Sequence, residues 1–401
     1  MTNAYCPVAI AILLLAGCSS KTTPNSGQID PQPAAASEQS RDASPESPVQ
    51  NASRPFEFTV DIDQYLAQTA CDEMTDSCRT YREIGRAPEI TVYVHEIPGV
   101  KADYDIDCDG DGTFEQTGLT KSTTCKYEKT GQFRIRMRGE IPGVVLCGDD
   151  ETEQTYGFSN HLAVVSVDAW GDIRWKTMNS FALNCQNLTK LPKDAPILDE
   201  VTDMSAMFMG ALHFNQPIGH WDMSHATNLA RMFTAAFEFN QPLDKWDTSH
   251  VTDMSNMFML CREFNQPIGS WDVSQVTDMS GMFSEAGEFN QPLERWDVSH
   301  VTSMDGMFRG ASSFNQPLNA WDVSHVTNMQ GMFNRASSFN QPLDKWDVSR
   351  VIYMNAMFWG AKSFGQNIDV WNVSAVQHME QMFHDSGRED MPVWYAQKND
   401  I

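Results

Sequence analysis

The apolar and polar positions of residues 201–383 repeat with a period of 25 residues. Tryptophan marks this period at Trp221, Trp246, Trp271, Trp296, Trp321, Trp346 and Trp371. The sequence around each tryptophan is close to F-N-Q-P-L-x-x-W-D-V-S-x-V-T-x-M-x-x-M-F. A fixed period of this length is typical of stacked repeats, in which each unit packs only on its neighbours. The period therefore predicts an extended surface, and such surfaces commonly bind other molecules.

The unit at 289–313 predicts two short elements. Residues 292–296 are extended, and Pro292 restricts them to the start of a strand. After them the apolar side chains follow the spacing of one buried helical face. These apolar positions are Val301, Met304, Met307 and Phe308. One strand and one helical or 3-10 turn per repeat predicts a mixed α/β repeat solenoid of the leucine-rich-repeat kind.

The region before the repeats has a different pattern. Within residues 54–140, apolar and polar side chains alternate in 56–62, 90–94 and 132–137, and turns rich in Gly, Pro and Asp separate these segments. Short alternating segments of this kind predict β-strands, here in a small β-sandwich. The predicted fold is therefore a repeat solenoid preceded by a β-sandwich.

The two ends of the repeat array need caps, because the outer units would otherwise expose their core. Residues 141–200 begin to follow the 25-residue spacing, and we expect them to form the N-terminal cap. The repeat pattern stops after residue 383. Residues 384–401, which include Trp394 and Tyr395, are expected to form a short C-terminal cap.

The repeat motif resembles that of the BspA-like leucine-rich-repeat surface lipoproteins of bacteria, and it covers about half of the chain. Residues 170–181 are similar to the segment that precedes such arrays. In the β region, 104–114 followed by 130–133 resembles the turn and late strand of PKD-type, immunoglobulin-like domains. The resemblance implies exposure at the cell surface and a role in binding or adhesion. It implies no catalytic residues, and ligands differ between members.

The first residues predict export and a lipid anchor. Residues 7–16 are apolar but too few to span a membrane as a mature helix, which is typical of a signal peptide over 1–17. The run from Leu15 to Cys18 resembles a bacterial lipobox, which implies that Cys18 is lipidated after cleavage. Residues 1–6 carry no Lys or Arg, so a plain signal peptide or a misplaced start codon is the alternative.

Residues 18–53 would then be the lipidated cysteine and a stalk. They are rich in Ser, Pro, Ala and Gln, a composition that cannot bury enough apolar surface to fold. If the cell is Gram-negative, Ser19 after the lipidated cysteine favours the outer membrane. The formal net charge of −25 argues against nucleic-acid partners and against electrostatic docking on anionic lipid. We therefore expect membrane contact through the lipid anchor only.

The cysteines agree with export, because disulfides form in oxidising compartments. Pairing of sequence neighbours would join Cys71 to Cys78, Cys108 to Cys125 and Cys147 to Cys185. Six cysteines allow fifteen pairings, so the other pairings stay open. Cys261 lies at a repeat position that elsewhere holds a small residue, and we expect it to be a buried filler and not a reactive thiol.

A run of alternating acids is the one candidate metal site. Its members are Asp105, Asp107, Asp109 and Asp111. They match the start of a calcium-binding loop, but the twelfth position, which should be a bidentate Glu, is Gln116. Glu115 lies one place too early. We therefore favour an acidic hairpin turn over a calcium site and expect no other cofactor.

Three polar columns run through the repeats. The aspartates after each tryptophan (from Asp222 to Asp347) precede Ser or Thr at capping offsets, which favours capping of backbone amides over cation binding. The asparagines after each repeat Phe (from Asn215 to Asn340) are expected to satisfy turn amides of adjacent repeats. The histidine column is interpreted as an exposed polar stripe, because two imidazoles alone are a poor metal site. Its members are His225, His250, His300 and His325.

No Gly-X-Ser-X-Gly, His-Glu-X-X-His, phosphate-loop or dinucleotide motif occurs, so an enzyme is not expected. The first hypothesis is a lipid-anchored surface protein whose array binds a protein or glycan through variable positions. The candidate residues are the histidine column together with Asp244, Lys245, Glu294, Arg295, Asp344 and Lys345. The alternatives are a structural envelope protein without an exogenous ligand and, more remotely, a carbohydrate-active enzyme that uses the acidic columns.

Overall fold

The computed structural model describes residues 53–398, apart from 68, 73–76, 81, 84, 86 and 148–159. The signal peptide, Cys18 and nearly all of the stalk predicted from the sequence lie outside the described residues. No helix in the described part of the chain is long and apolar enough to cross a membrane.

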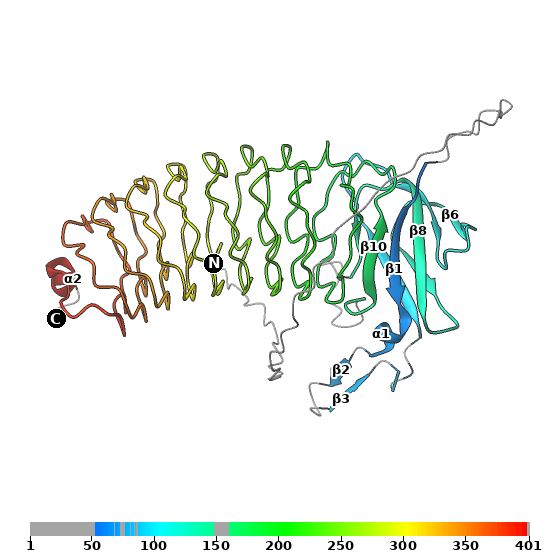
Figure 1. Cartoon of the computed structure of the whole chain (residues 1–401), viewed down its shortest axis with the longest axis horizontal. Coiled ribbons are helices and arrows are strands. Elements are labelled where there is room, and N and C mark those ends of the chain that lie inside the picture. The colour runs from blue at the N-terminus through cyan, green and yellow to red at the C-terminus, as the bar shows by residue number, and fades with distance from the viewer. Residues whose placement is uncertain are drawn as a thin grey trace, which may run out of the picture. The chain divides into compact units, whose positions relative to one another are not determined.

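Antiparallel sheets make up the first part of the described chain (Figure 1). The five-stranded sheet has the order β10 (Val164–Ala169), β1 (Phe56–Asp61), β8 (Gln132–Glu140), β5 (Asp103–Asp107) and β6 (Gln116–Leu119). The three-stranded sheet has the order β7 (Thr123–Lys126), β4 (Glu89–Val94) and β9 (Val144–Val145). A separate pair joins β2 (Thr69–Asp72) to β3 (Ser77–Thr80). The helices are α1 (Ile62–Ala67) and α2 (Val393–Lys398).

The alternating sequence segments form strands because one face of each is buried. In β1 the side chains of Phe56, Phe58 and Val60 are fully buried, while those between them are partly exposed. Strand β1 lies between β8 and β10, so it is paired along both edges. Since β10 belongs to this sheet, the sheet extends into the segment 141–200 that we assigned to the N-terminal cap.

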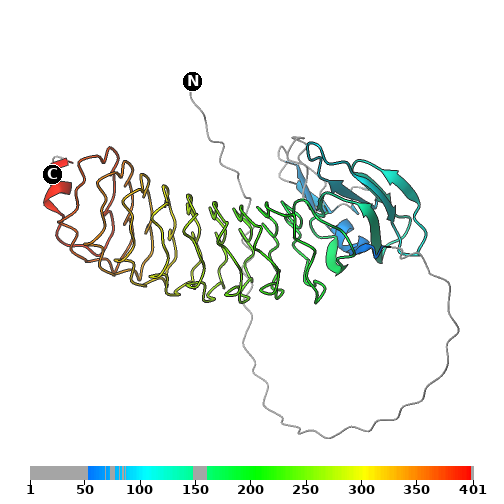
Figure 2. The same cartoon turned by 90° about the horizontal axis from the view of Figure 1, so that it is seen from above.

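The predicted mixed α/β solenoid is wrong. Among the described residues, helix occurs only in α1 and α2, each six residues long, and neither lies inside a repeat. The named strands are all in antiparallel sheets before residue 170. Each repeat consists of turns and contributes a single residue to a parallel bridge, such as Ser303 with Asn328, where we expected a strand. Figures 1 and 2 show the repeats as similar loops stacked side by side, from green to red.

The backbone of residues 304–311 shows why no helix forms. The amides of Met307 and Arg309 donate to carbonyls three residues earlier, which closes successive turns. The amides between them donate to the following repeat instead: Gly306 N–H bonds the Gln330 carbonyl, and Phe308 N–H bonds the Met332 carbonyl. Gly306 has a φ of 59°, a left-handed conformation that interrupts a right-handed helix. Side chains spaced three residues apart therefore share one buried face without helical hydrogen bonds.

Columns of identical side chains fill the interior of the array. The tryptophans of the repeats are only 3–4% exposed. Neighbouring tryptophans stack, as Trp296 and Trp321 do with ring centroids 6.4 Å apart. Phe308 stacks on Phe333 of the next repeat at 5.7 Å. The tryptophan column is therefore part of the interior scaffold of the array.

Candidate functional site

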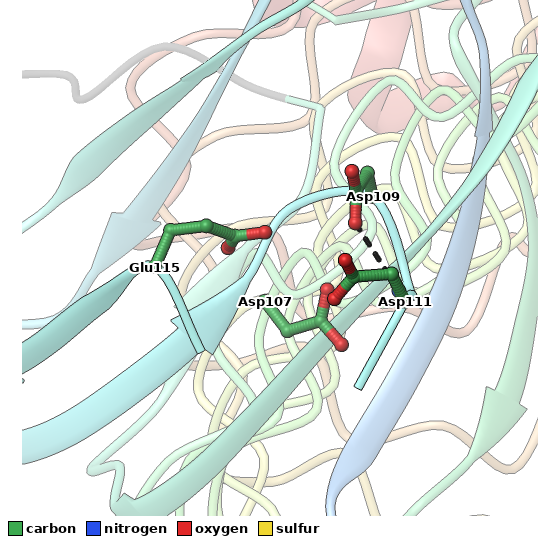
Figure 3. A group of neighbouring side chains, drawn as sticks. All are labelled: Asp107, Asp109, Asp111 and Glu115. Atoms are coloured by element: carbon green, nitrogen blue, oxygen red, sulfur yellow. Dashed lines mark hydrogen bonds between the residues drawn. The ribbon is translucent and has the colours of Figure 1, made fainter. Parts of the chain in front are cut away.

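The loop between β5 and β6 gathers four acidic side chains (Figure 3). One oxygen from each of Asp107, Asp109, Asp111 and Glu115 lies within 4.8 Å of the others. Strand β5 ends at Asp107, which is fully buried, and the other three side chains are exposed. Oxygen-rich sets of this kind are what Ca²⁺ prefers in proteins. This is the one group of three or more metal-binding side chains within the described residues.

Backbone amides already occupy part of this oxygen set. The two carboxylate oxygens of Asp107 accept hydrogen bonds from the amides of Gly110 at 2.7 Å and Gly112 at 3.0 Å. Glu115 Oε2 accepts from the Cys108 amide at 2.9 Å. Gly110 has a φ of 79°, and a Cβ there would lie 2.7 Å from the Arg134 carbonyl oxygen, so the turn requires glycine. The loop is therefore held in shape by its own amides.

Asp105 is not part of this cluster, which corrects the predicted metal set. Its Oδ2 accepts from Arg138 Nη2 at 3.0 Å, and its Oδ1 accepts from the Gly118 amide. Glu115, which we had placed out of register, takes part instead. The sequence shows the role of Glu115 only when the positions of the calcium loop are counted from Asp107 instead of Asp105. A loop that starts at Asp107 has Gly112 at its sixth position and Glu115 at its ninth. Gly118 then occupies the twelfth position, so no bidentate Glu closes the loop.

The acids of the loop also affect the neighbouring Tyr127. Burial raises the pKa of the Tyr127 phenol, and the charges of Asp109, Glu115 and Asp107 raise it further. The phenol donates a hydrogen bond to the Cys108 carbonyl at 3.0 Å. Cys108 is in turn joined to Cys125 by a disulfide. The loop is thus fixed on β7 from one side.

The aspartate column caps turns, as predicted. Asp247 Oδ1 accepts from the Ser249 amide at 3.1 Å and from the Ser249 hydroxyl at 2.6 Å. The same amide bond recurs at Asp222, Asp272, Asp297, Asp322 and Asp347. The Ser hydroxyl first and the Ser amide second hold the pKa of Asp222, Asp247, Asp297, Asp322 and Asp347 below its usual range.

The asparagine column links adjacent repeats. Asn290 Oδ1 accepts from the Asn315 amide and from Gln316 Nε2, both at 2.9 Å. The same bonds join the other repeats, and at the end of the column the Gly365 amide donates to Asn340. The prediction that these side chains satisfy turn amides of neighbouring repeats is confirmed.

The predicted binding residues are all exposed. The charged positions before each tryptophan (Asp244, Lys245, Glu294, Arg295, Asp344 and Lys345) are exposed. So are the four histidines of the column, His225, His250, His300 and His325. None of these histidines joins a metal-binding group among the described residues.

Two of the predicted disulfides are present. They join Cys108 to Cys125 and Cys147 to Cys185. In the β2–β3 pair Cys71 lies opposite Cys78 along the backbone, but the side chains of these two cysteines lie outside the described residues. Cys261 is a buried free thiol, and burial raises its pKa, which confirms it as an inert filler.

Comparison with known proteins places the repeats in a family. Residues 176–295 and 277–394 both match the family described as "Mycoplasma protein of unknown function, DUF285". The two matches overlap and together span residues 176–394, more than half of the chain, so the chain belongs to this family. No curated protein and no solved structure matches the chain.

Proposed function

We propose that this chain is a lipid-anchored surface protein whose repeat array binds a protein or glycan ligand. One contrast carries the proposal: each buried tryptophan follows an exposed residue that differs from repeat to repeat. These exposed residues are His220, Lys245, Ser270, Arg295, Ala320, Lys345 and Val370. The buried residues are closely similar in every repeat and hold the backbone fixed, while the exposed residues vary and give the surface its own chemistry. Repeat proteins commonly bind their partners through such surfaces.

The backbone of the array supports a binding role because it is held in place between repeats. Amides of one repeat donate to carbonyls of the next, as between Phe283 and Met307 and between Phe308 and Met332. A preorganised surface loses little conformational entropy when it binds a partner. The resemblance of the repeat motif to BspA-like surface lipoproteins supports the same role, and Cys18 is the proposed lipid attachment site.

Microarrays of printed glycans and extracellular proteins test this proposal directly. The full chain carrying Cys18→Ala, which removes the proposed anchor, would be applied to printed glycans and extracellular proteins. We expect saturable binding to a restricted set of them. Absence of binding to every printed glycan and protein would contradict the proposal and favour the alternative of a structural envelope protein.

The location of the protein needs its own experiment. Intact cells that carry the unaltered chain or the Cys18→Ala variant would be treated with a membrane-impermeant amine-reactive label. We expect labelling of the cell-bound unaltered chain and release of the variant into the medium or periplasm. A chain that stays unlabelled on intact cells would remove the surface location while leaving the binding activity to be judged by the arrays.

The acidic loop supports a second candidate function, the binding of Ca²⁺ to stabilise the sheet region. The observation in its favour is the approach of four carboxylates around Asp107. Because four negative charges repel one another, a divalent cation would relieve that repulsion. We expect Ca²⁺ to raise the melting temperature of the chain and Asp109→Asn to weaken this effect. Equal melting temperatures with Ca²⁺ and with a chelator would exclude the site.

A further inference from the structure

A hollow opens on the array where four consecutive repeats meet. Its volume is about 190 Å³. The polar and aromatic side chains that line it include Asp305, Arg309, Gln330, Asn334, Asn355 and Trp359. None of these residues belongs to the positions that we first considered for binding. The hollow is smaller than the roughly 300–1,000 Å³ of sites for drug-sized ligands, so it has room for a single small ring or group.

Two glycines create the hollow. Gly306 and Gly331 occupy the same position in consecutive repeats and have φ values of 59° and 58°. A Cβ on Gly331 would meet only Asn334 Cβ at 3.7 Å, and one on Gly306 would meet only Arg309 Cβ at 3.8 Å. The space beside both backbones is therefore open. At the same position an earlier repeat has Asn256, so this conformation also accepts a side chain.

A buried polar atom in the lining lacks a partner. Asn334 is only 5% exposed, and its Oδ1 accepts no hydrogen bond within the protein. A buried acceptor without a donor costs about 1–3 kcal/mol, so a ligand that donates a hydrogen bond here would recover that loss. Unlike the asparagine column, this side chain does not link two repeats. It is the observation that points from the hollow to a ligand.

The rest of the lining defines the chemistry of that ligand. Trp359 is partly exposed, and the Arg335 guanidinium lies over its ring at 5.3 Å from the centroid. Asp305 and Arg309 carry opposite charges, so together they favour no net charge on the occupant. Gln330 and Asn355 add amide groups that can both donate and accept. The lining combines an aromatic ring with several amides, one acidic side chain and one basic side chain.

We propose that this hollow binds one neutral sugar ring of a glycan. A pyranose offers C–H groups on one face, which suit the exposed part of the Trp359 ring, and hydroxyl groups around its rim, which suit the amides. One hydroxyl donates to Asn334 Oδ1, and others bond Asp305 and Arg309. The inference rests on the proposed binding function of the array and names the ligand class and the site.

Saturation-transfer NMR on the full Cys18→Ala chain tests the site with the methyl glycosides of glucose, galactose, mannose and N-acetylglucosamine as probes. Single-unit binding in this kind of open hollow is expected in the millimolar range. We expect transfer to at least one glycoside. Trp359→Ala and Gly331→Asn should each weaken it about tenfold or more, because one removes the ring and the other fills the hollow.

Two matched variants control for effects on the fold. Ala206→Asn makes the corresponding change at the same repeat position, also with a positive φ, far from the hollow along the chain. Tyr353→Ala removes an exposed ring that stacks on His378 and does not line the hollow. Both should bind as the parent chain does. Trp359→Ala could weaken binding by disturbing the fold. Gly331→Asn fills the hollow but keeps Trp359, so it tests the site independently of that effect.

The proposal is overturned if none of the four glycosides shows transfer, or if Trp359→Ala and Gly331→Asn bind them as well as Ala206→Asn does. Neither result decides whether the repeat array binds a protein or glycan at another place. If the chain still binds printed glycans or proteins and Trp359→Ala leaves that binding unchanged, the repeats bind these ligands through another surface. If the chain without further substitutions binds no printed glycan or protein, the proposed function itself is contradicted.

Discussion

Trp394 Nε1 donates a hydrogen bond to the carbonyl oxygen of Ile368 at 3.2 Å. Inside the array Trp371 makes the equivalent bond to Leu343 at 2.9 Å. Trp394 also stacks on Trp371, with ring centroids 6.3 Å apart and planes inclined by 17°. It comes from the short helix α2 and not from a further repeat. This helix therefore supplies the tryptophan of a missing next repeat and covers the end of the column.

This relationship predicts how much the end of the array depends on Trp394. Trp394→Ala should destabilise the last repeats, but by less than Trp296→Ala, because Trp394 is partly exposed and Trp296 is only 3% exposed. The buried substitution should cost about 3–5 kcal/mol. Urea unfolding followed by circular dichroism measures both losses.

Trp394→Phe separates the ring contact from the hydrogen bond. It keeps an aromatic ring against Trp371 and removes the indole N–H, so it should cost about 1 kcal/mol. If Trp394→Ala is as stable as the parent chain, α2 does not act as a cap.

The asparagine column gives a second prediction. Asn290→Ala leaves the half-buried Asn315 amide without its acceptor and removes one of the two acceptors of Gln316 Nε2, which still donates to the Asn290 carbonyl at 3.0 Å. The expected loss is about 1–2 kcal/mol of unfolding free energy. Asn290→Asp keeps an acceptor oxygen and should lose less at neutral pH. Equal losses for the two variants would show that the side-chain oxygen is not what links the repeats.

The aspartate column predicts acid sensitivity. Hydrogen bonds from Ser249 and its counterparts lower the folded-state pKa of Asp247, Asp297 and Asp322. The unfolded value is about 3.9. A lowered folded pKa gives stability that is present above the unfolded pKa and is lost as pH falls through the folded pKa. The melting temperature should therefore fall as the pH drops below about 4.

Serine variants show whether the aspartate column causes the loss of stability in acid. Ser249→Ala, Ser299→Ala and Ser324→Ala together remove the strongest cause of the lowered pKa and leave the net charge unchanged. The combined variant should lose less stability between pH about 5 and about 3 than the parent chain does. An identical loss in both proteins would assign the acid sensitivity to other carboxylates.

The interior of the array could be predicted from the sequence because it repeats. The spacing of Trp296 and Phe308 shows which positions are buried, and the fixed Asn290 position shows where amides need acceptors. The helical turn was wrong because turns of three residues and one helical face give the same apolar spacing. What separates them is the positive φ at residues such as Ala206 and Asn256, which are not glycine and give no sequence signal.

The sites depend on three-dimensional contacts that spacing alone does not show. Asp105 belongs to the acidic run in sequence, but its ion pair with Arg138 on β8 removes it from the loop. Glu115 joins the loop because the chain turns at Gly112. The hollow beside Trp359 exists only because Gly306 and Gly331 are one repeat apart, and both are unremarkable when each repeat is considered alone.

The measurement that tests the central claim most directly is a comparison of two charge reversals on the same printed glycans and proteins. One variant carries Lys245→Glu, Arg295→Glu and Lys345→Glu beside the tryptophan column. The control carries the same charge change in the β region, at Lys101, Lys126 and Lys129, which are also exposed. We predict that the array variant loses at least one interaction that the parent chain and the control keep. Identical binding by all three proteins would contradict the claim that the variable exposed positions of the array bind the ligand.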